Sequence, residues 1–197
     1  MGYLAYDGAD AENHNLAIGS AALGGPVNGG EYNVAVGNYT LDALTSGDEN
    51  TAIGYQAGSS LTTANQNTLV GRKAGFAVTE ASNTTCVGNN AGAGITTGAR
   101  NTVLGNAALE TADTEGDNLA IGFNALNVVN SGGEYNVAIG NYALDSLTSA
   151  DFVTAVGYNA GTAVTTGGYN TLIGYQSGDA ITVADGNVGV GHDTLGT

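Results

Sequence analysis

Small and apolar residues recur along this chain at a fixed spacing of 17 or 18 residues. Each repeat centres on a glycine that follows a branched aliphatic residue, which itself follows a small or apolar one, as in Ala52-Ile53-Gly54. The glycines stand at Gly19, Gly37, Gly54, Gly71, Gly88, Gly105, Gly122, Gly140, Gly157, Gly174 and Gly191. This register runs through the whole chain, so we predict a single repeat domain over residues 1–197.

A repeat of this length predicts one coil of a parallel β-solenoid. Helical-hairpin repeats need roughly 33 residues or more, and the β-branched, glycine-rich composition opposes helix. We therefore predict an all-β fold of about eleven coils. Each coil is expected to hold two or three short strands, and successive coils are expected to stack about 4.8 Å apart.

A block of six repeats is duplicated within the chain. Segments 31–41 and 134–144 agree at nine of eleven positions and lie 103 residues apart, which is the length of six repeats.

Two positions within the repeat are occupied almost throughout by one residue type, glycine or asparagine. We call the set of residues at one repeat position a column. An invariant glycine indicates positive φ or a backbone that approaches a neighbour too closely for a Cβ atom. Asparagine stands four residues before the glycine in nine of eleven repeats, with Thr84 and Val153 as the exceptions, and predicts a ladder of stacked amides along the solenoid axis. The structural positions that we single out are Asn50, Gly54, Asn67, Gly71, Asn101, Gly105, Asn118, Gly122, Asn170 and Gly174.

Two neighbouring columns are both apolar, which predicts a sheet that is buried on both faces, because adjacent strand residues point to opposite sides. We expect the branched aliphatic residues, such as Ile121 and Ile139, to face the core of the coil. The smaller residues before them, such as Ala120 and Ala138, are expected to pack against other chains. The pattern thus predicts a homo-oligomer with cyclic symmetry.

Repeats such as Asn50-Thr51-Ala52-Ile53-Gly54-Tyr55-Gln56-Ala57-Gly58 resemble the Asn-x-Ala-Ile-Gly-x-x-Ala coils of the YadA-like head domain of trimeric autotransporter adhesins. Similar repeats occur in trimeric phage tail fibres. The resemblance covers essentially the whole chain. It implies a left-handed parallel β-roll with three chains side by side, and a role in surface adhesion or fibre structure.

Charge and hydropathy narrow the choice of partner. The chain has 18 acidic and 3 basic residues and a net charge of −15, which disfavours nucleic acid and anionic membranes. No apolar run reaches the length of a membrane span. The sequence given shows no signal peptide and no neck, stalk or anchor barrel, which favours a virion appendage over a bacterial adhesin, at an extracellular or virion surface.

Residues that could carry catalysis are sparse. The two histidines, His14 and His192, lie at opposite ends, and no Ser/His/Asp set, Cys/His cluster or phosphate loop is visible. We expect a protein without catalytic residues, metal or cofactor. The acidic stretch that contains Glu115 and Asp117 is expected to be a solvated turn, and Cys86 a buried small residue.

Two further columns suggest binding surfaces. Aromatic residues follow the glycine and predict either ring-over-ring packing or an outward stripe that binds a cell-surface glycan or receptor, at Tyr39, Tyr55, Phe123, Tyr142, Tyr158 and Tyr175. Threonine fills the eighth position after the glycine, at Thr45, Thr62, Thr79, Thr96, Thr148, Thr165 and Thr182. A regular threonine array is also typical of ice-binding solenoids, although threonine is equally a good ladder residue.

The sequence thus predicts the structural and adhesive shaft of a homotrimeric fibre, either a phage tail fibre or virion appendage or a surface filament, that mediates attachment. Ice binding through the threonine column is one alternative. A self-assembling extracellular filament subunit is another, because neither end shows a cap and we expect the rod to join flanking domains or further copies head to tail.

Overall fold

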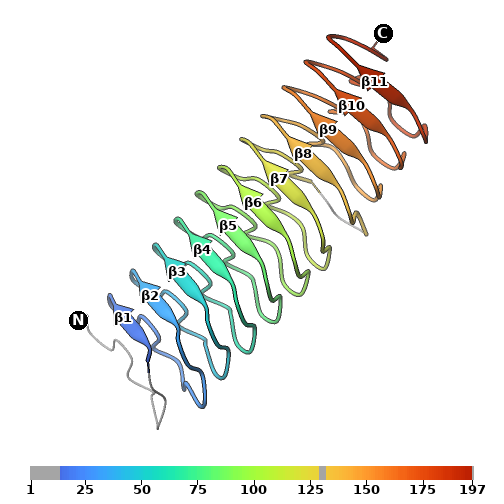
Figure 1. Ribbon diagram of the computed structural model, residues 1–197. Coiled ribbons are helices and arrows are strands. Elements are labelled where there is room, and N and C mark those ends of the chain that lie inside the picture. The colour runs from blue at the N-terminus through green and yellow to red at the C-terminus, as the bar shows by residue number, and fades with distance from the viewer. Residues whose placement is uncertain (1–13, 129–131, 197) are drawn as a thin grey trace.

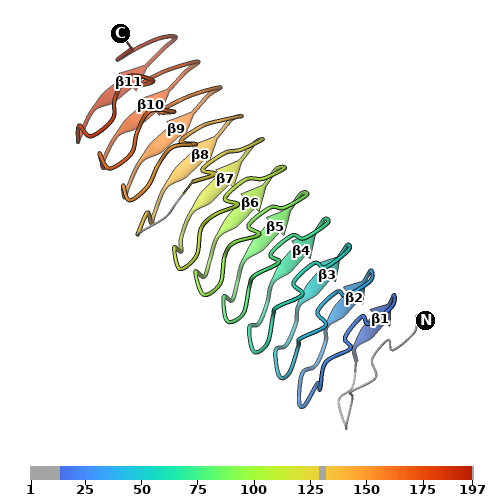
Figure 2. The same ribbon diagram turned by 180° about the vertical axis from the view of Figure 1, so that it is seen from behind.

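The computed structural model describes residues 14–128 and 132–196. These residues form a rod of stacked coils, and each coil contributes one three-residue strand to a single parallel sheet (Figures 1 and 2). The strands are β1 (Leu16–Ile18), β2 (Val34–Val36), β3 (Thr51–Ile53), β4 (Thr68–Val70), β5 (Thr85–Val87), β6 (Thr102–Leu104), β7 (Leu119–Ile121), β8 (Val137–Ile139), β9 (Thr154–Val156), β10 (Thr171–Ile173) and β11 (Val188–Val190). Their order in the sheet follows the chain.

The predicted all-β parallel solenoid with a spacing near 17 residues is confirmed, and the described part of the chain contains no helix. The expectation of two or three strands per coil is wrong, because each coil has one. Left-handed residues interrupt the backbone on both sides of every strand, such as Glu49 at φ 58° and Gln56 at φ 56°. The turns still bond from coil to coil, as where the Gln56 amide donates to the Asn38 carbonyl at 3.0 Å.

The interior of the rod is lined by the small column, the residues two before each glycine. From Ala35 in β2 to Leu172 in β10, every member of this column is fully buried. The aliphatic column, the residues directly before each glycine, points outward instead, and Leu104 is 48% exposed. Our assignment of the two columns was therefore wrong: Ala120 and Ala138 lie in the core, while Ile121 and Ile139 lie on the outside, half-buried.

The physical reason for this inversion is the narrowness of the coil. Leucine side chains from the opposite wall, such as Leu41 and Leu144, fill most of the interior and leave room only for small residues on the strand. Where the strand itself carries a leucine, the opposite wall has glycine. A Cβ atom on Gly58 would lie 2.7 Å from Cδ1 of Leu69, and one on Gly75 would lie 2.7 Å from Cδ2 of the same side chain.

The glycine column brings the backbones of successive coils into contact. Gly122 has φ +136°, and a Cβ atom there would lie 2.5 Å from the carbonyl oxygen of Gly140 in the next coil. Both a left-handed conformation and a close approach therefore require glycine at this position.

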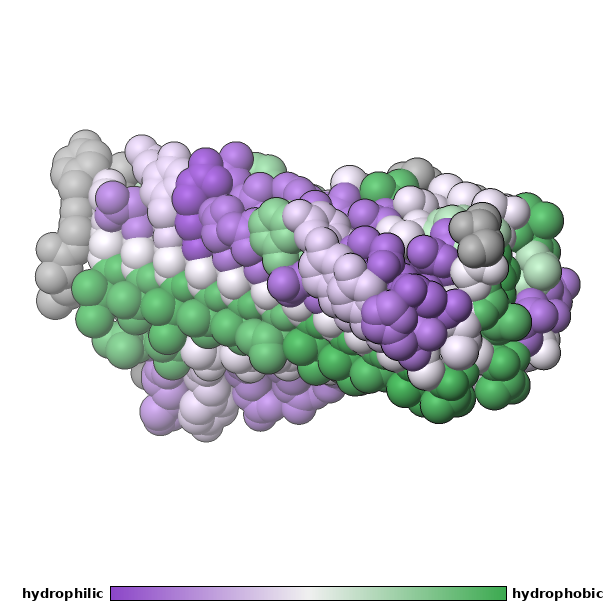
Figure 3. Space-filling view, turned by 90° about the horizontal axis from the view of Figure 1, so that it is seen from above, coloured by the Kyte–Doolittle hydropathy of each residue, from purple (hydrophilic) through white to green (hydrophobic). Residues whose placement is uncertain are grey.

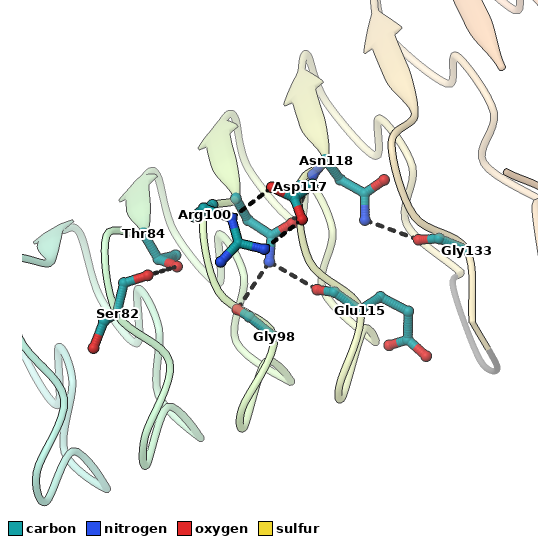
Figure 4. Close-up of polar contacts among 9 residues, drawn as sticks. Ser82, Thr84, Gly98, Arg100, Glu115, Asp117, Asn118 and Gly133 are labelled. Carbon is teal, nitrogen blue, oxygen red and sulfur yellow. Dashed lines mark hydrogen bonds and ion pairs between the residues drawn. The ribbon is translucent and has the colours of Figure 1, made fainter. Parts of the chain in front are cut away.

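The asparagine column forms a buried hydrogen-bonded ladder. The amide N–H of Asn67 donates to Oδ1 of Asn50 at 3.0 Å, and Nδ2 of Asn67 donates to the Ala81 carbonyl at 2.9 Å. Figure 4 shows the equivalent bond from Asn118 to the Gly133 carbonyl, at 2.8 Å. Each side chain thus satisfies backbone groups of the next coil, which leaves few buried polar groups unpaired.

We predict that Gly122→Ala destabilises the rod by about 3 kcal/mol or more, because it combines a backbone clash with a strained φ. Gly29→Ala is the matched control. Gly29 also has positive φ, at +95°, but nothing lies within 4 Å of its Cβ position, so we expect a loss of only about 1 kcal/mol. Equal losses for the two variants in urea unfolding would show that close approach between coils does not constrain the column.

Candidate functional site

The outward surface of the sheet carries an aliphatic column along its whole length. We call it the sheet face; it consists of the first and third residues of each strand. The third residues form the aliphatic column, of which Ile173 is 39% exposed. Figure 3 shows hydrophobic residues gathered in a band along the rod. Large contiguous apolar patches are typical of interaction sites, which makes the sheet face a candidate site.

The sheet face is also uncharged, although the chain carries a net charge of −15. Its second column is mixed, with Val137 and Leu119 on some strands and threonine on six others. These threonines are Thr51, Thr68, Thr85, Thr102, Thr154 and Thr171. Sequence reasoning missed this threonine column, because it treated the strand as buried on both sides.

The aromatic residues that follow the glycines form two clusters at the turn after the strand. Tyr39 and Tyr55 make one, with ring centroids 6.0 Å apart. Phe123, Tyr142, Tyr158 and Tyr175 make the other, with successive centroids 5.3, 5.9 and 5.5 Å apart, and His192 stacks on Tyr175 at 5.0 Å. The rings pack over one another from coil to coil and remain partly exposed. The coils between the clusters carry Arg72, Asn89 and Asn106 at the first position of this turn.

A second aromatic column lies at the other edge of the strand, five residues before the glycine. Tyr135 stacks on Phe152 at 5.1 Å, and Phe152 stacks on Tyr169 at 5.2 Å. Tyr169 is 67% exposed. The sequence signal for this column is weak, because polar residues such as Gln66 occupy it in the middle coils.

The polar residues of this second column form hydrogen bonds with their counterparts in the neighbouring coil. Nε2 of Gln66 donates to Oε2 of Glu49 at 2.9 Å, and Arg100 donates two bonds to Asp117, at 2.6 and 2.7 Å (Figure 4). The hydrogen bond from Arg100 lowers the pKa of Asp117 below its ordinary value. Both side chains lie at the surface, where such pairs add little stability.

The acidic stretch around Glu115 differs from the expected solvated turn. The Glu115 side chain is buried, and its carboxylate accepts backbone N–H bonds from Asp113, Thr114 and Gly132 at 2.8, 3.0 and 2.9 Å. This carboxylate therefore satisfies backbone N–H groups of its own and a neighbouring turn. Over residues 14–128 and 132–196, no group of three His, Cys, Asp or Glu side chains is placed to hold a metal ion.

The threonines eight residues after the glycine serve the backbone. The Thr45 hydroxyl donates to the Thr62 carbonyl at 2.9 Å, and Thr148 donates to Thr165 at 3.0 Å. Most of these side chains are half-buried. Their donor hydrogens are thus already used in coil-to-coil bonds, whereas the threonines of the sheet face stand outward.

The two histidines lie far apart in the fold. His14 stacks on Tyr32 at 4.9 Å near the first coil, and His192 pairs with Asp193 at 2.9 Å in the last. Two shallow, open concavities lie on the turns. One, of about 280 Å³, is lined by Tyr142, Asp145, Tyr158, Asn159 and Thr162, and another, of about 250 Å³, is lined by Asp48, Glu49, Asn65 and Gln66.

Comparisons of the chain with protein-family models, with curated proteins and with solved structures find no match. A helix long and apolar enough to cross a membrane is absent from the residues that the structure describes.

The single thiol offers a test of interior packing. Cys86 is fully buried in the small column, and burial raises its pKa to about 12. Because the thiolate is the reactive form, we predict that Cys86 reacts with a thiol reagent at neutral pH only when the rod unfolds. Labelling rates measured across a urea titration should follow the unfolding transition, and rapid labelling of the native protein would contradict the placement of Cys86.

Proposed function

We propose that this chain is a non-enzymatic segment of a trimeric fibre, a phage tail fibre or virion appendage or a surface filament, that mediates attachment at an extracellular or virion surface. The observation that carries the proposal is the sheet face, an uncharged apolar band along the rod (Figure 3). A rod alone in water leaves this band half-exposed at every coil.

Further copies of the same chain suit this face better than an unrelated partner. The band repeats at every coil, so a second copy in parallel presents the same residues at the same intervals. The acidic side chains lie off the sheet face, so close approach there brings no like charges together. A closed ring about an axis parallel to the rod buries the band on every copy. The resemblance to trimeric rolls sets the number of copies at three.

The aromatic clusters support the attachment role. They lie at the turn after the strand and contribute no side chain to the sheet face. Partly exposed rings such as Tyr55 and Tyr158 provide flat apolar surface for a receptor or glycan.

Ice binding is the second candidate, and one observation favours it. Six threonines of the sheet face stand beside the aliphatic column on a regular parallel sheet, as in Thr51 beside Ile53. This array differs from the threonine column that the sequence suggested. An ice binder would show thermal hysteresis in solution, whereas a trimer that buries the sheet face would show none.

We predict that the wild-type chain has a solution mass three times its 19.4 kDa. Replacing Ile121 and Ile139 together with Glu should give a folded monomer, because six carboxylates would meet at the axis of a trimer. Ser149→Glu, at an exposed turn position, is the matched control and should remain trimeric. The masses are measured by light scattering, and far-ultraviolet circular dichroism checks the fold.

A monomeric wild type would contradict the proposed assembly, as would a double variant that stays trimeric. Steady turnover of an ester or acyl donor would contradict the non-enzymatic role.

A further inference from the structure

The concavity at Tyr142 and Tyr158 combines apolar rings with a fixed carboxylate. The two rings meet edge to face, with centroids 5.9 Å apart and planes at 81°. Asp145 lines the same concavity, and its Oδ1 accepts a hydrogen bond from the Thr162 hydroxyl at 2.7 Å. Asn159 adds an amide that can both donate and accept. The concavity is open and its exposed lining is more polar than apolar, so it suits a ligand with many hydroxyl groups that lies across the surface.

An equivalent set of residues occurs a second time in the chain, 103 residues earlier, with Gln and Ser in place of Asn and Thr. The counterparts are Tyr39, Asp42, Tyr55, Gln56 and Ser59. The rings of Tyr39 and Tyr55 lie 6.0 Å apart at 86°, nearly the geometry of the first pair. Ser59 stands where Thr162 donates to Asp145, so a hydroxyl residue accompanies the aspartate in both copies.

The repeat itself does not demand this combination. In the coil of Gly71, the positions of Tyr158 and Asp145 are taken by Arg72 and Phe76, and other coils place Asn89 and Ala93 there. Those coils stack in the same continuous sheet. The combination therefore follows the duplicated block, and its second copy keeps both tyrosines and the aspartate unchanged.

The Asp42 carboxylate is partly buried, which disfavours its charged form. Burial raises its pKa above the ordinary value, with an opposing hydrogen bond from Ser59. Its Oδ1 atom is buried and is the one such side-chain oxygen without a hydrogen-bond partner in the described coils. An unsatisfied buried acceptor costs free energy, and because this oxygen is buried it is not available to a ligand.

We propose that the concavity at Tyr142 and Tyr158 and the equivalent surface at Tyr39 and Tyr55 are binding sites for neutral saccharides. The tyrosine rings would pack on the apolar C–H faces of a sugar ring, while the aspartate accepts hydrogen bonds from sugar hydroxyls. The carboxylates and the net charge of −15 disfavour sialic and uronic acids. This inference rests on the proposed attachment function and names its ligand class. The sites lie six coils apart, roughly 29 Å at the usual strand spacing, so one polysaccharide chain can bind both.

The test is equilibrium dialysis with radiolabelled maltotetraose, mannotetraose and chitotetraose at millimolar concentration, with sialyllactose as the anionic comparison. The wild-type chain should bind two molecules of at least one neutral probe. Replacing Tyr142 and Tyr158 with Ala should leave one, and replacing Tyr39 and Tyr55 as well should leave none. Asp145→Asn together with Asp42→Asn should weaken binding about tenfold, because charge-assisted hydrogen bonds are lost. Tyr169→Ala, at an exposed ring outside both sites, should bind like wild type.

The inference is overturned if the wild type binds no neutral probe, if the four-tyrosine variant still binds, or if sialyllactose binds as tightly as the neutral sugars. Light scattering on the same samples separates this failure from that of the fibre assembly. A trimer that binds no sugar overturns the saccharide sites alone, while a monomer that binds two sugars overturns the trimer alone.

Discussion

Contact between the backbones of successive coils at the glycine column is the constraint on which the rest of this structure depends. At Gly122 the carbonyl of the next coil occupies the space that a Cβ atom would need. This approach fixes the height and register of each coil on its neighbour, so equivalent residues lie over one another along the rod. A shift by one residue would turn every strand side chain to the wrong face.

Because the register is fixed, equivalent side chains of successive coils contact one another and form ladders along the rod. Inside the rod, asparagines such as Asn50 and Asn67 bond both to each other and to backbone groups. Outside, tyrosines such as Tyr158 and Tyr175 stack, and the polar pair Arg100 and Asp117 bonds across one coil step. The same residue type therefore contributes at every repeat, and the outer ladders are free to vary in chemistry without changing the fold.

Much of the fold could be predicted from the sequence because period and glycine spacing reflect the backbone directly. Hydropathy could not show which strand residue faces the interior, since Ala120 and Ile121 are both apolar. A size signal was present in the sequence: Leu69 stands where other coils have alanine, and the position opposite is Gly75 instead of leucine. That compensation identifies the small column as the interior.

Other features depend on interactions that the sequence pattern does not show. The single strand per coil follows from left-handed residues such as Gln56. Glutamine rarely adopts positive φ, so this conformation is not evident from the sequence. The aromatic column that contains Phe152 appears only in some coils, so it has no period of its own. Among the six tyrosine and phenylalanine positions expected to form one stripe, the structure separates two clusters, and only the duplicated block relates one to the other.

The central claim is that the aliphatic column is covered by further copies of the chain. Cysteine cross-linking tests it most directly, because Cys86 is buried and does not compete for the reagent. With Ile121→Cys, a short bis-maleimide should join two chains within minutes of mixing in dilute solution, while Ser149→Cys on the exposed turn should remain uncross-linked. Equal, slow and concentration-dependent cross-linking at the two positions would show that the sheet face meets solvent and would contradict the account.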